Sequence, residues 1–189
     1  MGKALIVVDV QVDFCEGGAL GVAGGNKVAA DVAALLSDAQ GYDAIVATRD
    51  HHIDPGPHFS DDPDFVDSWP PHCVVGTPGQ ELHPDLTGFG FDAVFDKGSY
   101  EAAYSGFEGS TSAGVPLARW LGLHGVTAVD VCGIATDFCV LATALDAAAE
   151  GFDTAVLGGL TAAVHPGDVA EVRTRLERKG VTWATGPLS

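Results

Sequence analysis

The sequence predicts an α/β fold with a mainly parallel sheet of about six strands, on three observations. Short apolar runs rich in β-branched residues recur along the chain, and most lack the alternation of a half-exposed strand. Helix-like segments stand between these runs, which implies right-handed crossovers. The 189 residues are 47% hydrophobic and 19% charged, a composition that suits one globular domain without disulfides.

Six runs are expected to form the strands, because each is short, apolar and suited to burial on both faces of a sheet. In chain order they are Ala4–Val10, Ala44–Thr48, Ala93–Phe95, Val126–Ile134, Asp153–Leu157 and Val181–Ala184. Four segments with helical spacing or helix-end signals are expected to form helices. They are Asn26–Ala39, Pro116–Leu123, Thr136–Glu150 and Asp168–Lys179.

The chain from 51 to 90 does not follow this alternation, since it is rich in Pro, His, Gly and Asp. A compact domain rarely carries about 40 irregular residues without a purpose. We therefore expect an ordered functional loop region there, within a single domain that covers residues 1–189.

Polar residues follow the predicted strands, and in an open parallel sheet ligands bind outside the carboxyl ends of the strands. The strands end near Asp9, at Asp50, at Asp96-Lys97 and, for the fourth, at Gly133-Ile134-Ala135. Cys139 comes shortly after the fourth strand. These side chains are expected to converge on one edge of the sheet.

Cys139 lies in the run Gly-Ile-Ala-Thr-Asp-Phe-Cys, between a strand and an Ala-rich helix. This position predicts a sulfur in the first turn of the helix, where unpaired N–H groups and the helix dipole favour a thiolate. The same N–H groups suit a tetrahedral oxyanion. A nucleophile is one interpretation, and a buried structural cysteine is the other.

Asp9 and Lys97 are the candidate partners of this thiol. Asp9 interrupts the apolar run Val-Val-Asp-Val, where an unpaired charge would be costly. A lysine beside the sulfur would stabilise a thiolate, and a carboxylate beside both would move the proton. The alternatives are an aspartate that merely ends a strand and a solvated loop lysine.

Asp50, His52, His58 and His72 form a candidate metal site. Four of the seven histidines fall between positions 51 and 72. Three imidazoles and a carboxylate suit zinc, iron or manganese, so one divalent ion is expected. The alternative is a set of surface loop histidines.

Four aromatic residues flank these groups in sequence: Phe14, Trp69, Tyr104 and Phe138. They are suited to wall a pocket for a flat ring. Packing in the core is the other interpretation of each of them.

Charge and hydropathy exclude several classes of function. The net charge is −17, from 26 acidic and 9 basic residues, which argues against nucleic acid and anionic membrane as partners. No apolar run approaches the roughly 20 residues that span a bilayer. The four cysteines form no CxxC pair and the N-terminal run reads as a strand rather than a signal peptide, so we expect a reducing cytoplasm. The acidic excess also suggests a salt-tolerant source, with an ordinary acidic enzyme as the alternative.

Several of these residues fall in motifs of a known family. The chain resembles the nicotinamidase and pyrazinamidase group of the isochorismatase-like cysteine hydrolases over nearly its whole length. The motifs that carry the resemblance are VVDVQVDFCEGG (Val7–Gly18), ATRDHHIDPGPHFS (Ala47–Ser60), SWPPHCVVGTPG (Ser68–Gly79), FDKGSYEAAYSGFEG (Phe95–Gly109) and VCGIATDFCV (Val131–Val140).

The resemblance implies a single three-layer α/β/α domain with a role for each candidate residue. It makes Asp9, Lys97 and Cys139 a catalytic triad. It makes Asp50, His52, His58 and His72 the metal ligands. It places a cis peptide at Ile134–Ala135 and an oxyanion hole at the N–H groups of Ala135 and Cys139. The substrate contacts that it implies are Phe14, Trp69, Tyr104, Ile134, Ala135 and Phe138.

The reaction that the resemblance implies is hydrolysis of nicotinamide to nicotinate and ammonia through a thioester, feeding NAD salvage. Pyrazinamide would be hydrolysed in the same way. The sequence departs from some members at Phe138, where certain relatives carry histidine. Another amide or isochorismate as substrate remains an alternative, although isochorismate would need neither the cysteine nor the metal. A non-catalytic metal-binding or thiol redox protein is the alternative from a different class.

Overall fold

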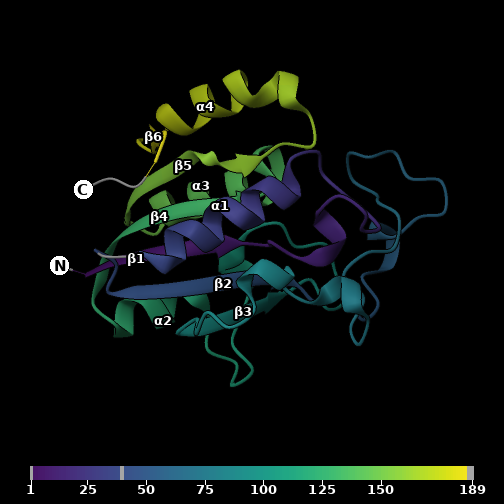
Figure 1. Ribbon diagram of the computed structural model, residues 1–189, viewed down its shortest axis with the longest axis horizontal. Helices are drawn as coiled ribbons and strands as arrows, with labels where there is room; N and C mark the ends of the chain where they lie inside the picture. Colours follow the sequence, from purple (N-terminus) through teal and green to yellow (C-terminus); the bar gives the residue numbers. More distant parts are fainter. Residues whose placement is uncertain (1, 39–40, 187–189) are drawn as a thin grey trace.

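Parallel strands form the centre of the molecule, as the apolar runs predict. The computed structural model describes residues 2–38 and 41–186. Within these ranges the strands form one sheet in the order β3-β2-β1-β4-β5-β6 (Figure 1). They are β1 (Gly2–Val8), β2 (Ala44–Asp50), β3 (Ala93–Lys97), β4 (Val126–Ile134), β5 (Asp153–Ala162) and β6 (Thr182–Ala184). Every neighbouring pair is parallel, so all the carboxyl ends lie at one edge.

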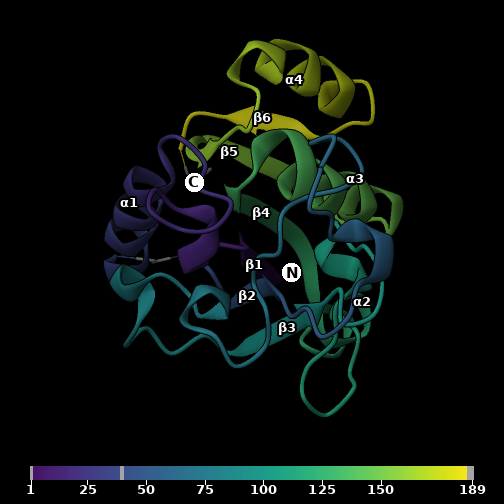
Figure 2. The ribbon, with the colours of Figure 1, turned by 90° about the vertical axis from the view of Figure 1, so that its right-hand side faces the viewer.

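Helices cover both faces of this sheet, which confirms the predicted three layers. The helices are α1 (Gly25–Ser37), α2 (Leu117–Leu123), α3 (Leu141–Ala149) and α4 (Val169–Glu177). Viewed along the sheet, α1 lies on one side and α2 and α3 on the other (Figure 2). Each side has its own apolar cluster, and β1 contributes side chains to both, with Ile6 in one and Leu5 in the other. This burial on both faces explains why the strand runs do not alternate.

The predicted strand limits are close to those observed, with one notable difference in β5. This strand continues to Ala162, beyond the predicted end at Leu157. The pairing of β5 with β4 shifts register here, since Val131 of β4 pairs with Val156 and Gly133 pairs with Thr161. Gly158 and Gly159 lie in the extra length of β5 between these two pairs. The apolar run of β5 therefore ends at Leu157, whereas its pairing with β4 resumes at Thr161.

The predicted helices are present, and one of them is divided. The segment Thr136–Glu150 begins with η6 (Thr136–Val140), a π-helical turn, and continues as α3. The segment Asn26–Ala39 corresponds to α1, although Ala39 lies outside the described residues. In the part of the chain that is described, no helix has the length and apolar character to cross a membrane.

The irregular stretch from 51 to 90 is the crossover from β2 to β3, and it has no α-helix of its own. It contains three short 3-10 turns, η2 (Gly56–His58), η3 (Pro78–Gln80) and η4 (Pro84–Leu86). Isolated bridges join His52 to Val74 and Phe59 to Trp69. Leu86 and Cys73 are buried in the same cluster as α1, so this stretch completes the layer on that face.

The strand order reverses between β1 and β4, because the chain leaves β1 toward β2 and β3 and returns to β4 on its other side. In open parallel sheets ligands bind at such a switch point. Asp9 follows β1, and the turn that carries Cys139 follows β4. The topology therefore brings together the two residues that the sequence proposes as base and nucleophile.

Candidate active site

The polar residues at the strand ends converge, as expected, on one buried cluster. Asp9 follows β1 with a φ of 48°, a conformation uncommon for residues other than glycine. Asp50 and Lys97 are the last residues of β2 and β3. Cys139 lies in η6, after β4. All four side chains are buried, with Asp9 fully inaccessible to solvent.

Lys97 stands at the centre of this cluster. Its Nζ lies 2.9 Å from Asp9 Oδ2 and also donates to Asp50 Oδ1. It donates to the carbonyl of Ala103 at 3.0 Å and lies 3.7 Å from Cys139 Sγ. One ammonium group therefore faces two carboxylates and the sulfur at once.

Burial and charge act against each other on these groups. Burial lowers the pKa of Lys97, but Asp50 and Asp9 outweigh it and hold that pKa well above its ordinary value. Burial raises the pKa of Asp50, yet Lys97, His52 and His72 bring it well below the usual range. The pKa of Asp9 is raised, mainly by burial, with Lys97 opposing the shift. Asp9 is thus a stronger base than an ordinary aspartate.

Cys139 differs electrostatically from the expectation of a thiolate at a helix start. Burial raises the pKa of this thiol well above its ordinary value, Lys97 lowers it, and Asp9 and Asp50 raise it further. The surrounding turn is π-helical, and the two carboxylates bring more negative charge than Lys97 neutralises. The thiol therefore requires a base to lose its proton, and Asp9, which is near enough to raise the pKa of the thiol, is the candidate.

The peptide bond between Ile134 and Ala135 is cis, as the resemblance implies. It lies where β4 passes into η6, directly before the turn that carries Cys139. Ile134 and Ala135 are both buried and both line the pocket above the sulfur.

Three histidines from the irregular stretch meet beside Asp50. One ring nitrogen from each of His52, His58 and His72 lies within 4.8 Å of the others. Asp50 Oδ2 lies 3.3 Å from His52 Nε2 and 3.6 Å from His72 Nε2. The rings contact one another, with centroids 5.0 to 5.6 Å apart. All four predicted ligands are therefore at one place.

The hydrogen bonds of these rings fit a metal ion. His52 Nδ1 lies 2.6 Å from the carbonyl of Gly98, and His72 Nδ1 lies 2.8 Å from the carbonyl of Pro70. Each bond places a proton on Nδ1 and leaves the Nε2 lone pair free. Among the described residues, three buried side-chain polar atoms lack a hydrogen-bond partner, and two of them are His52 Nε2 and His58 Nδ1. Such nitrogens are costly unless they ligate something, so this cluster suits one divalent ion.

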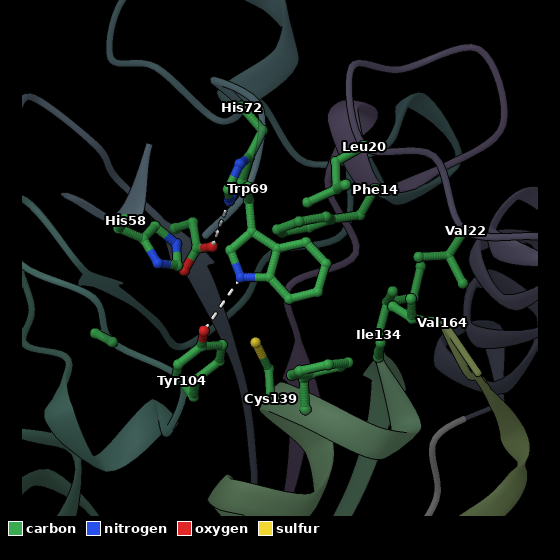
Figure 3. Close-up of a pocket in the computed structure, with 14 residues that line it drawn as sticks. Phe14, Leu20, Val22, His58, Trp69, His72, Tyr104, Ile134, Cys139 and Val164 are labelled. Carbon is green, nitrogen blue, oxygen red and sulfur yellow. Dashed lines mark hydrogen bonds and ion pairs between the residues drawn. The ribbon is translucent and has the colours of Figure 1, made fainter. Parts of the chain in front are cut away.

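A pocket opens above the sulfur, and Figure 3 shows Cys139 pointing into it. Its walls are mostly aromatic and aliphatic, and all six predicted substrate contacts line it: Phe14, Trp69, Tyr104, Ile134, Ala135 and Phe138. Asp50, His58 and His72 border the same space. Trp69 Nε1 donates to the Tyr104 hydroxyl at 3.1 Å. The rings of Trp69 and Phe138 pack edge to face, with their centroids 5.0 Å apart. A flat ring with one polar end fits these surroundings.

Four lining residues were not anticipated from the sequence: Leu20, Val22, Ala103 and Val164. Val164 follows the carboxyl end of β5. The expectation that ligands bind at the carboxyl ends of parallel strands, which pointed to Asp50 and Lys97, therefore also applies to Val164. Leu20 and Val22 lie in the segment between η1 (Val12–Phe14) and α1, and no local pattern marks them.

Two buried polar residues that support the site were also missed. Gln11 is fully buried and donates to the carbonyls of Asp50 and Gln80 while accepting from the Asp50 N–H. Thr48, on β2, donates to Asp9 Oδ1 at 2.6 Å. Both interrupt or directly follow apolar runs, and that is the sequence signal that would have found them.

Comparison with known proteins agrees with this geometry. The chain is 56% identical over 162 residues to the nicotinamidase/pyrazinamidase of Mycobacterium tuberculosis, which covers 86% of this chain and 87% of that protein. It is 35% identical over 154 residues to the nicotinamidase of Escherichia coli, covering 72% and 71% respectively.

Solved structures of nicotinamidases and pyrazinamidases have the same fold as this chain. A pyrazinamidase of Pyrococcus horikoshii in complex with zinc superposes with a TM-score of 0.82 at 36% identity, covering 97% of this chain and 99% of that one. The PnC1 protein of L. infantum in complex with nicotinate superposes with a TM-score of 0.84 at 37% identity, covering 96% and 91%. The family model described as the isochorismatase domain matches residues 3–186, and the chain belongs to the isochorismatase family.

Proposed function

We propose that this protein hydrolyses nicotinamide to nicotinate and ammonia through a thioester on Cys139, and accepts pyrazinamide in the same way. The observation that carries the proposal is the buried group of Cys139, Lys97 and Asp9 beneath an aromatic pocket that also borders the histidine cluster. Relatives named nicotinamidase, and one solved with nicotinate, support the same substrate.

In this proposal the pocket holds the pyridine ring among Phe14, Trp69 and Phe138, with the carboxamide directed at Cys139 Sγ. Asp50, His52, His58 and His72 hold one divalent metal ion. When bound, the ion supplies an electrophilic anchor for the ring nitrogen and so orients the amide. A related pyrazinamidase was solved with zinc, and the donor set is equally suited to iron or manganese.

The first half-reaction begins when Asp9 takes the proton of Cys139, since the raised pKa of Asp9 makes it a suitable acceptor. The sulfur attacks the amide carbonyl, and the N–H groups of Ala135 and Cys139 stabilise the oxyanion. Asp9 then gives its proton to the amide nitrogen, the C–N bond breaks, and ammonia leaves a thioester behind. Lys97 keeps its charge throughout and balances the negative charge on its neighbours.

The second half-reaction releases the acid. Asp9, again a carboxylate, takes a proton from a water molecule that attacks the thioester. The C–S bond breaks, Asp9 returns the proton to the sulfur, and the acid formed departs as nicotinate after its remaining proton passes to solvent water. Nicotinate formed in this way would enter NAD salvage.

We place this reaction in a reducing cytoplasm, with no nucleic acid or membrane as a partner. All four cysteines are free thiols, the state in which a reducing cytoplasm keeps them. The irregular stretch from 51 to 90 contributes His52, His58 and His72 and so serves as the metal-binding region of the single domain.

An assay of ammonia release tests the proposal. The purified protein is given nicotinamide and pyrazinamide, before and after treatment with a chelator and again after zinc, iron or manganese is added back. We expect turnover of both amides, loss of turnover on chelation and recovery with at least one metal. No release of ammonia from either amide under any metal condition would overturn the proposal.

A further inference from the structure

Thr48 makes two contacts with Asp9. Its carbonyl accepts the backbone N–H of Asp9 at 3.2 Å, and its hydroxyl donates to Asp9 Oδ1 at 2.6 Å. Thr48 is fully buried on β2, and its neighbour in the register is Val8, the residue before Asp9. The hydroxyl is therefore held against the carboxyl by strand pairing.

The two oxygens of Asp9 consequently have different surroundings. Oδ1 faces the Thr48 hydroxyl, and Oδ2 lies 2.9 Å from Lys97 Nζ. The hydrogen bond occupies Oδ1, whereas among the described residues Oδ2 is buried without a hydrogen-bond partner, so Oδ2 is the oxygen left open to accept a proton from sulfur. When Oδ2 carries the proton, Oδ1 remains a carbonyl oxygen and the same hydrogen bond persists.

The orientation of the Thr48 hydroxyl is set by the methyl group of the same side chain. A Cβ added to Gly106 would lie 2.7 Å from Thr48 Cγ2, so the methyl occupies the space that a side chain would need there. Gly106 is held in turn by its N–H, which donates to Thr143 Oγ1 at 2.8 Å. A β-branched side chain with its methyl fixed in this way has one available rotamer.

We propose that Thr48 is a positioning residue of the reaction, whose hydroxyl orients Asp9 and selects the oxygen that accepts the proton of Cys139. The inference rests on the proposed amidase function. Thr48 is not among the residues that line the pocket, and its hydroxyl donates to Asp9, so it acts through Asp9.

Pairs of variants that differ chiefly at the hydroxyl test this role. Thr48→Val keeps the shape and removes the hydroxyl, while Thr48→Ser keeps the hydroxyl. We expect Thr48→Val to lower kcat/KM by about 10- to 100-fold, the effect of losing one hydrogen bond to a charged group, mostly through kcat. Thr48→Ser should retain most of the wild-type rate.

A shift in the pH profile separates this role from a merely structural one. The charged and titratable groups around Asp9 are Lys97 from β3, Asp50 from β2 and Cys139 from η6. The hydroxyl of Thr48 lowers the pKa of Asp9, so its removal should move the acidic limb of kcat/KM to higher pH. Thr154→Val, at a buried threonine of β5 whose hydroxyl donates to the carbonyl of Phe152, is the matched control and should leave the limb in place.

The outcomes are distinct. An unshifted profile with less than a twofold loss in Thr48→Val overturns the inference, as does an equal loss in Thr48→Ser. If Thr48→Val does not fold, Thr48→Ala replaces it and is compared with Thr48→Ser, since these two differ only by the oxygen. Wild-type protein without amidase activity contradicts the proposed function instead, before any variant is measured.

Discussion

At the scale of single residues, Lys97 has the most consequential position. Its fully buried ammonium lies between Asp9 and Asp50, so it belongs at once to the thiol group and to the histidine cluster. Buried charges persist only when they are paired, and removal of one partner leaves the others uncompensated. The two functions of the site, proton transfer and metal binding, therefore share one cation.

Cys139→Ala should reduce ammonia release from nicotinamide by at least about 10³-fold, because no other described group in the pocket can form the thioester. The metal content should remain that of the wild type, since Asp50 and the histidines are unchanged. Cys132→Ala is the control, at a buried thiol of β4 that does not line the pocket. Substantial turnover by Cys139→Ala would refute the nucleophile assignment.

His58 makes the stability of the protein depend on pH when no metal is added. Burial, with His72 and His52 nearby, lowers the pKa of His58 to about 4, whereas an unfolded histidine titrates near about 6.5. The unfolded chain thus binds a proton between these values and the folded protein does not. The contribution of His58 to stability is complete above about pH 6.5 and is lost as the pH falls toward 4.

Urea unfolding measured from pH 7 to about 4 checks this expectation. As the pH is lowered, the free energy of unfolding should decrease less steeply in His58→Gln than in the wild type. His124→Gln makes the same substitution at an exposed position and serves as the control. Equal slopes for His58→Gln and the wild type would contradict the assignment.

At the scale of elements, the approach of β4 to β1 decides where the nucleophile lies. Gly133, at the end of β4, pairs with Val8 of β1 and has a φ of 116°. An added Cβ would lie 2.0 Å from the carbonyl oxygen of Val8. The absence of a side chain at this position therefore allows the end of β4 to reach the level of Asp9.

Gly133→Ala should destabilise the protein by about 3 kcal/mol or more, because both the backbone conformation and the neighbouring strand exclude a side chain. Gly122→Ala is the matched control, since Gly122 lies in α2 with no atom within 4 Å of an added Cβ. There we expect a gain of up to about 1 kcal/mol. Chemical denaturation of both variants checks this, and a similar effect at the two sites would contradict it.

At the scale of the whole molecule, the net charge of −17 opposes the compact state through self-repulsion. The internal ion pairs at the site are buried and little affected by salt, whereas the surface charges are screened within about 10 Å at 0.1 M salt. The overall repulsion and the local pairs are therefore separable by ionic strength.

The free energy of unfolding should rise with added NaCl, as screening relieves this repulsion. Urea unfolding across a salt series measures it. A variant with Asp61→Asn and Asp62→Asn removes two exposed charges and should gain less stability from salt than the wild type. A stability that stays flat or falls with salt would contradict the expectation and the suggested salt tolerance of the source.

The strands and helices could be predicted from the sequence more fully than the loop residues that line the pocket. The strands were predictable because burial on both faces leaves continuous apolar runs, as in Ala4–Val8, and the helices because they leave helical spacing or helix-end signals. The loop residues Leu20 and Val22 were not, since their place in the pocket depends on the path of a segment without periodicity. The π-helical form of η6 was also missed, because propensity cannot distinguish it from the start of α3.

The sequence by itself determined which residue types stand at the strand ends: an acid after β1, an acid at the end of β2, a lysine at the end of β3 and a cysteine after β4. The tertiary structure alone decided how they act together. It set Lys97 within reach of both carboxylates, raised the pKa of Cys139 and gave Asp9 its bond to Thr48. The physical reason is that a strand end can be read from neighbouring residues, whereas electrostatics depends on distances between residues far apart in the chain.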